Sequence, residues 1–178
     1  DLGGGMMNVA GGTTTILPNG NFGPIYESEA FNEDVWISGL PRLHIDVSTA
    51  TVGGQIYALL EDCSEEGYCI HIGHAIMDLR YHEGGDQEQT WLPIFDTINA
   101  KMEFFAMDVQ IEAGHIIRLS LASTGEDYLP ASTSSIVEVS EGSNSNLLID
   151  IINPEDKLLF NPPTCTHQAC LDWLNQTA

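Results

Sequence analysis

The chain has 178 residues, of which 43% are hydrophobic, and it carries 26 acidic residues against five lysines and arginines. This size and composition fit one domain with a packed core and exclude a disordered chain, and no apolar run approaches the ~18 residues of a membrane-spanning helix. The net charge of −21 argues against nucleic acid and anionic membranes as partners, because both would repel the chain. The acidic residues are expected to form a solvated surface, with cation binding by some clusters as the alternative.

The first segment, residues 1–26, is rich in Gly, Asn and Thr and is predicted to be a linker or an extended arm. Ile16 and Leu17 are the residues that could anchor it to a core. Because the chain begins at Asp1, we expect either a processed mature form or a piece of a longer protein.

The middle segment, residues 27–153, alternates apolar and polar side chains, which is typical of half-buried strands. At least seven strands are expected: Arg42–Ser48, Gln55–Leu60, Cys69–Tyr81, Lys101–Ile111, His115–Ala122, Ser135–Val139 and Asn146–Ile152. Gly, Pro and Ser turns separate them, and Gly114 is expected to end the fourth. Many short strands with such turns predict an all-β sandwich of Greek-key or jelly-roll type.

The last segment, residues 154–178, is predicted to be a tail with a short helix through Ala169 and Leu174. It holds one of two local cysteine pairs, and these pairs are Cys63 with Cys69 and Cys165 with Cys170. Their spacing favours two short disulfide loops over a zinc site, although four cysteines allow three pairings. Oxidised pairs would place the protein in a secreted, extracellular or cell-surface setting, and Asn175 begins a glycosylation sequon.

Catalytic motifs are absent from the sequence. There is no G-x-S-x-G nucleophile pattern, and no Gly-rich phosphate loop lies between a strand and a helix. No catalytic residue is therefore predicted. His71 and His74 are three residues apart, so on a regular strand they would point to opposite faces and chelate a metal poorly unless a bulge intervened.

Acidic turns supply the only metal candidates, because carboxylate oxygens in loops suit Ca²⁺. The predicted calcium ligands are Glu61, Asp62, Glu65, Glu66, Glu126 and Asp127. Their spacing does not match the twelve-residue helix–loop–helix calcium loop.

Four stretches, in this order along the chain, carry a family resemblance. They are ESEAFNEDVWISGLPRLHIDV (27–47), ALLEDCSEEGYCIHIGHAIMDLRY (58–81), EAGHIIRLSLAS (112–123) and SNLLIDII (145–152). Together they resemble the C-terminal domain of X-prolyl dipeptidyl peptidases and cocaine-esterase-like serine hydrolases. The most specific stretch is similar to the A-G-H-R-L-R-L strand of that family, with Ile116 in place of the first Arg. In the last stretch, Asp150 replaces the usual Pro.

This resemblance, which covers about residues 3–153, implies a jelly-roll or galactose-binding-like sandwich packed against an α/β-hydrolase domain. In the family the catalytic Ser, Asp and His lie in the hydrolase part, and none can be placed on this chain. The matched residues Arg80, Gly114, His115 and Arg118 are therefore expected to be structural. The two arginines are scarce cations in an acidic chain, so each is expected to neutralise an acidic partner.

Three functions remain open at this point. The first is a non-catalytic accessory domain of a secreted serine hydrolase that affects substrate access, stability or assembly. The second is a structural module that assembles with copies of itself by lending its N-terminal arm to the sheet edge of a neighbour, with Ca²⁺ as a bridge. The third is a carbohydrate-binding module that stacks sugars on aromatic residues. The aromatic residues in question are Trp36, Trp91, Trp173, Tyr26, Tyr68 and Tyr128.

Overall fold

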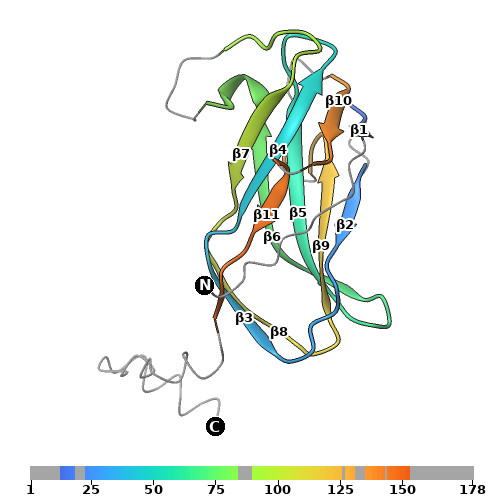
Figure 1. Ribbon diagram of the computed structural model, residues 1–178, viewed down its shortest axis with the longest axis vertical. Coiled ribbons are helices and arrows are strands. Elements are labelled where there is room, and N and C mark those ends of the chain that lie inside the picture. The colour runs from blue at the N-terminus through green and yellow to red at the C-terminus, as the bar shows by residue number, and fades with distance from the viewer. Residues whose placement is uncertain are drawn as a thin grey trace, which may run out of the picture.

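Two β-layers facing each other make up the protein in the computed structural model (Figure 1). The structure describes residues 13–18, 23–83, 90–125, 127–130, 135–142 and 144–152. Within them lie twelve strands and one short 3-10 helix, so the predicted all-β sandwich is confirmed. No helix among these residues has the length and apolar character needed to cross a membrane.

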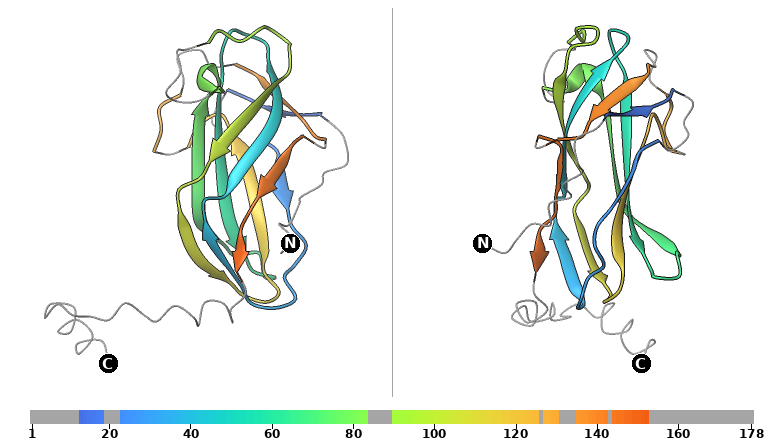
Figure 2. Two further views of the ribbon diagram at one scale, coloured as in Figure 1. Left: turned by 60° about the vertical axis from the view of Figure 1, so that its left-hand side comes forward. Right: turned by 45° about the vertical axis from the view of Figure 1, so that its right-hand side comes forward.

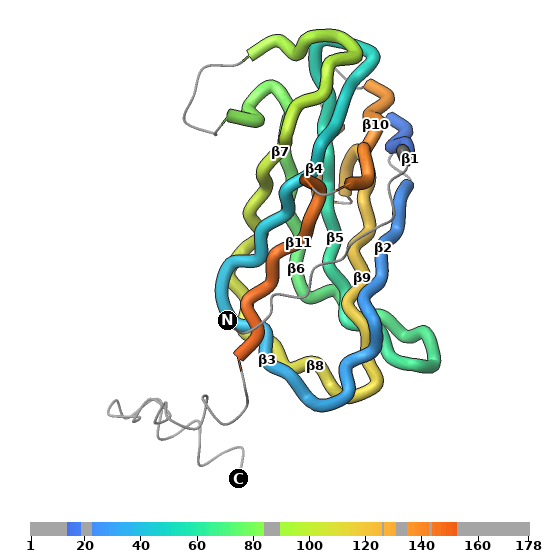
Figure 3. The backbone as a smooth tube through the Cα atoms, viewed as in Figure 1, coloured from blue at the N-terminus to red at the C-terminus, as the bar shows by residue number. Residues whose placement is uncertain are grey.

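The first layer combines two sheets that continue one another. A five-stranded sheet contains β1 (Thr13–Ile16), β10 (Val137–Ser140), β4 (Arg42–Thr49), β11 (Asn146–Leu148) and β7 (Ile98–Glu103). A three-stranded sheet contains β12 (Ile151–Ile152), β3 (Val35–Gly39) and β8 (Met107–Ile111). Because β3 leads into β4 and β8 follows β7, the two sheets lie end to end (Figure 3).

The second layer is a four-stranded sheet in the order β2–β9–β5–β6. Its strands are β2 (Ile25–Glu27), β9 (Ile116–Ala122), β5 (Gln55–Cys63) and β6 (Cys69–Asp78), and the 3-10 helix η1 (Leu79–Tyr81) follows β6. All pairings in both layers are antiparallel. Figure 2 shows the two layers side by side. The buried side chains of the core lie between them.

The alternating pattern of β4 explains how the core forms. Leu43, Ile45 and Val47 are buried, while the residues between them face outward and are partly exposed. On the opposite layer Ile56 and Leu60 of β5 are fully buried. Each such side chain contributes roughly 1.5–3 kcal/mol when it leaves water, so the pairing of the layers follows from the sequence pattern.

The prediction of a single strand over Lys101–Ile111 is wrong, because the strand is interrupted between β7 and β8. Phe104 is buried and its N–H donates to the carbonyl oxygen of Pro41 at 2.9 Å, whereas Phe105 is 69% exposed. The inward positions change from even to odd numbers at this point, which requires extra residues between the strands. The break lies beside the turn that separates β3 from β4 (Figure 1).

The ends of the sandwich differ from the predicted segment boundaries. Strand β1 pairs with β10 and β2 pairs with β9, so part of segment 1–26 lies in the sheets. Ile16 is fully buried, while Leu17 is 48% exposed. The predicted tail 154–178, with its helix, lies outside the described residues.

Candidate functional site

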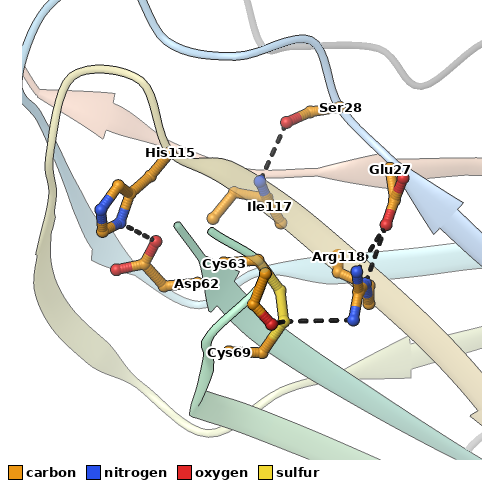
Figure 4. The surroundings of a disulfide bond; sticks show 9 residues. Glu27, Ser28, Asp62, Cys63, Cys69, His115, Ile117 and Arg118 are labelled. Carbon is orange, nitrogen blue, oxygen red and sulfur yellow. Dashed lines mark hydrogen bonds and ion pairs between the residues drawn. A yellow bond between two sulfur atoms is a disulfide. The ribbon is translucent and has the colours of Figure 1, made fainter. Parts of the chain in front are cut away.

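A disulfide closes the hairpin between β5 and β6 and organises one end of the sandwich (Figure 4). It joins Cys63 and Cys69, whose Cα atoms are 4.0 Å apart. Between them the Ser64 N–H donates to the carbonyl oxygen of Tyr68 at 2.8 Å, and Gly67 turns the chain with φ at 86°. The second predicted pair, Cys165 with Cys170, lies outside the described residues, as does Asn175.

His115 lies beside this hairpin and bonds a buried carboxylate. Its Nδ1 is 2.7 Å from Oδ1 of Asp62, which is 8% exposed. The turn before it needs Gly114, whose φ is 87°, and the Gly114 N–H donates to the Phe31 carbonyl oxygen at 2.8 Å. The Ala-Gly-His motif thus positions an imidazole that ties the start of β9 to the end of β5.

Arg118 extends this network across the sheet. Its guanidinium lies 2.8 Å from a carboxylate oxygen of Glu27 on β2, and its Nη1 lies 3.1 Å from Sγ of Cys69 on β6. Figure 4 shows these contacts on one face of the sheet. The arginine therefore links β2 with β6, which lie on opposite sides of β9 in the sheet.

This network lacks the parts of a nucleophilic active site. Among the described residues no hydroxyl or thiol lies within hydrogen-bond distance of the His115 ring, and no cysteine is free. A serine hydrolase needs a nucleophile bonded to its histidine base. The arrangement of Asp62, His115 and Arg118 can cross-link strands.

The predicted calcium ligands that the structure describes do not gather around one point. Within the described parts of the chain, no group of three or more His, Cys, Asp or Glu side chains could hold a metal ion. Asp62 is bonded to His115, and Glu126 lies outside the described residues. Calcium binding at Glu61, Glu65, Glu66 and Asp127 stays a prediction.

The two histidines of β6 lie on the same face, because a bulge interrupts the pairing of β5 with β6. The register shifts between Leu60 and Glu61, so that His71 pairs with Glu61 and His74 with Leu59. Nδ1 of His74 is 3.3 Å from Nε2 of His71. The expectation of opposite faces holds for a regular strand and is wrong here, since the bulge changes the alternation.

The opposite end of the sandwich is apolar. Four large side chains are exposed there: Val52 at 39%, Trp91 at 60%, Ile94 at 49% and Phe95 at 71%. They lie on the turn after β4 and on residues 90–97, which meet at the top of Figure 1. We call these four residues the apolar end.

Backbone contacts hold the apolar end in shape. The Leu92 N–H donates to the Val52 carbonyl oxygen at 3.0 Å, and the Phe95 N–H donates to that of Thr49 at 2.9 Å. Leu92 itself is buried, so it anchors residues 90–97 in the core. Phe95 has φ at 64°, a left-handed conformation that costs energy for a bulky residue and is frequent at functional sites.

Arg80, a predicted structural residue, borders this end. It follows Asp78, and its guanidinium bonds the Asp78 carboxylate through Nε and Nη2. Burial raises the pKa of Asp78, but hydrogen bonds from Arg80 outweigh it and leave that pKa below its ordinary value. The guanidinium carbon also lies 5.9 Å from the centre of the Trp91 ring, which is a cation–π distance.

The aromatic residues considered for sugar stacking are scattered. Tyr68 lies in the disulfide-closed hairpin, whereas Trp91 lies at the apolar end. The hydroxyl of Tyr26 donates to Glu141 between the layers, and Trp173 lies outside the described residues. No platform of adjacent rings is formed by Tyr26, Tyr68 and Trp91.

A family model described as the X-Pro dipeptidyl-peptidase C-terminal non-catalytic domain matches residues 18–146, well over half of the chain. The chain belongs to this family. The resemblance found in the sequence is thus confirmed, and the residues Arg80, Gly114, His115 and Arg118 fall within the match. None of the curated proteins compared with the chain matches it.

Solved structures share the fold at low sequence identity. A CocE/NonD family hydrolase from Staphylococcus aureus superposes with a TM-score of 0.69 at 12% identity over 81% of this chain and 33% of its own. An aminopeptidase from a marine sediment Thaumarchaeota archaeon gives 0.66 at 13%, over 81% and 33%. An alpha-amino acid ester hydrolase gives 0.62 at 17%, over 72% and 25%. The chain therefore spans a third or less of the length of these hydrolases.

Proposed function

We propose that the chain serves as the non-catalytic β-sandwich domain of an X-prolyl dipeptidyl peptidase-like or cocaine-esterase-like serine hydrolase. In this proposal it packs through its apolar end against the α/β-hydrolase domain that carries the catalytic residues. Its membership of a C-terminal non-catalytic family and its fit to one part of longer hydrolases support the proposal. The choice of the apolar end as the docking surface rests on the cluster of exposed apolar side chains there.

Exposed apolar clusters are unfavourable in water and mark interaction surfaces. Trp91 and Phe95 are 60% and 71% exposed although they sit on residues that are hydrogen-bonded and anchored in the core. Large rigid aromatic side chains of this kind dominate the binding energy of interfaces. Burying them against a partner would recover roughly 1.5–3 kcal/mol for each side chain that becomes fully buried.

The outer face of the first layer is a poorer docking surface. The outward positions of β4 and β7 are polar or charged, and they include Arg42, Asp46, Lys101 and Glu103. Such groups hold water, and desolvating them costs energy unless each one finds a partner. An apolar partner surface would therefore favour the end of the sandwich over this face.

The test has two arms. The isolated chain is incubated with a chromogenic X-Pro substrate. We expect no turnover, since no nucleophile lies beside His115 in the described part of the chain; turnover would contradict the proposal. In the native polypeptide that contains the chain, the double variant W91S/F95S should lower the thermal stability of the whole enzyme. The matched control is Y68S, which removes an aromatic side chain that is 79% exposed at the other end. Equal effects of the two variants would argue against docking through the apolar end.

Self-assembly is a second candidate because one observation favours it. Strand β1 lies at the edge of its sheet and contacts it through β10, so a neighbouring copy could supply the same strand. Deletion of residues 1–24 would convert an arm-exchanged assembly to monomers, as seen by analytical ultracentrifugation. An accessory domain would keep its oligomeric state.

We also propose a secreted or cell-surface location. The Cys63–Cys69 disulfide supports it, because such bonds persist in oxidising compartments. Mass spectrometry of native material, alkylated without reduction, should show both cysteines protected. Alkylation of both would contradict this location.

A further inference from the structure

The bulge in β6 creates a pair of imidazoles that the hydrolase-domain function does not use. Leu60 pairs with Gly73 and Glu61 with His71, so Ile72 has no partner on β5. Gly73 fits this place because a Cβ there would come within 2.5 Å of the Met107 side chain. The bulge thus brings His71 and His74 to one face, where His71 is exposed and His74 is half-buried.

The ring of His74 is held on several sides. Its Nε2 lies 2.8 Å from the hydroxyl of Tyr128, and its ring stacks on Tyr57 with 5.8 Å between the ring centres. Phe105 meets it edge-on at 5.5 Å. None of these contacts uses Nδ1 of His74, and this nitrogen faces Nε2 of His71. An imidazole fixed in this way needs little reorganisation to bind a ligand.

We infer that His71 and His74 form a binding site for Zn²⁺, with water molecules completing the coordination. The two ligand atoms are Nε2 of His71 and Nδ1 of His74, which are 3.3 Å apart. Zinc–nitrogen bonds of about 2.0–2.1 Å in a tetrahedral site place two nitrogens about 3.3–3.4 Å apart. The separation of the two nitrogens therefore matches the one that a shared zinc ion requires. Imidazole nitrogens are also ligands that zinc prefers.

The surroundings supply what such a site needs. Both histidines bind the metal as neutral imidazoles: each keeps one N–H, at Nδ1 of His71 and at Nε2 of His74, and presents its other nitrogen to the metal. With Nδ1 on the metal, the N–H of His74 at Nε2 donates to the Tyr128 hydroxyl oxygen, which fixes the ring as outer-shell partners of metal-bound histidines do. Glu61, directly across from His71, adds negative charge. Two protein ligands suffice because water fills the remaining positions, so the site agrees with the absence of any three-residue cluster among the described residues.

Calorimetric titration of the full chain with ZnCl₂ tests the inference. Excess Mg²⁺ is present so that it occupies carboxylates on the acidic surface. We expect one zinc site per chain that is weakened more than tenfold in H71A and in H74A. Since outer-shell partners contribute about 10–100-fold to metal affinity, Y128F should weaken binding within that range. The control is H44A, because His44 lies on β4 in the other layer. It should bind zinc as the unsubstituted chain does.

The same samples give a structural readout. In nitrogen-detected NMR of the imidazoles, the signals of His71 and His74 should shift on addition of zinc, while those of His44 stay in place. Absence of a zinc site in the unsubstituted chain would overturn the inference. Unchanged affinity in the H71A/H74A double variant would also overturn it, whether or not the chain binds zinc through other groups. Neither outcome touches the hydrolase-domain proposal, which rests on the opposite end of the sandwich.

Discussion

Gly125 lies against the ring of Tyr57, and its replacement by alanine tests how tightly the outer face of the second layer is packed. A Cβ at this position would lie 2.6 Å from Cε2 and Cζ of the tyrosine and 3.0 Å from its Cδ2. Carbon atoms that are not bonded to each other prefer about 3.5–4.0 Å. Either the ring or the backbone must therefore move.

The ring has little room to move. Tyr57 is 8% exposed, and it packs on His74 and on Tyr128 with ring centres 5.8 Å and 5.9 Å away. Overpacking of this kind costs about 1–3 kcal/mol. Loss of a glycine from the unfolded chain would return about 0.4–1 kcal/mol. The net expectation for G125A is a loss of about 1–2 kcal/mol, or a fall in Tm of about 2–8 °C for a domain of this size.

Urea unfolding followed by tryptophan fluorescence measures the effect. The matched control is G142A, because no atom lies within 4 Å of a Cβ built at Gly142 and its φ is not in the left-handed region. This control should equal or slightly exceed the stability of the unsubstituted protein. If G125A were as stable as G142A, the packing described around Tyr57 would be incorrect.

Three further predictions concern the core, the surface and pH. Leu60 is fully buried, so L60A should lose about 2–5 kcal/mol in urea unfolding; a loss below 1 kcal/mol would contradict its place in the core. Arg118 pairs with Glu27, whose side chain is 47% exposed, so R118Q should cost less than about 1 kcal/mol, and a loss as large as that of L60A would show a stronger role. Burial raises the pKa of Tyr26 to about 12 from an ordinary value of 10.0, so its contribution to stability is present below pH 10 and disappears as the pH rises toward 12. In pH-dependent unfolding Y26F should therefore lose less stability than the unsubstituted protein between pH 10 and 12, and parallel curves would contradict the assignment.

The fold could be predicted where one strand faces water on one side and the core on the other. In β4 the alternation of buried and more exposed residues matches the alternation of apolar and polar residues in the sequence from Arg42 to Ser48. The local sequence therefore determines which face of this strand is buried. Gly114 was predicted to end a strand and turn the chain, and its φ of 87° agrees with that role. The partner of His115 was not predicted, because the sequence placed Asp62 among the calcium candidates.

The features that the sequence did not predict correctly depend on contacts between segments that are far apart in the chain. Phe104 and Phe105 are adjacent aromatic residues, and the buried one is the one whose N–H bonds the distant Pro41. The bulge beside Gly73 likewise depends on the register with β5, which no local pattern specifies. The apolar end was missed because Val52 and Trp91 are far apart in the sequence. The one local signal was the apolar pair Ile94-Phe95 directly after a proline.

Amide hydrogen exchange of residues 90–97 tests most directly whether this sandwich docks on a hydrolase domain through its apolar end. The measurement compares the isolated chain with the native polypeptide that contains it. The account predicts much slower exchange at these residues in the native polypeptide, with the hairpin 64–68 exchanging at the same rate in both. Equal exchange at residues 90–97 in the two samples would contradict it.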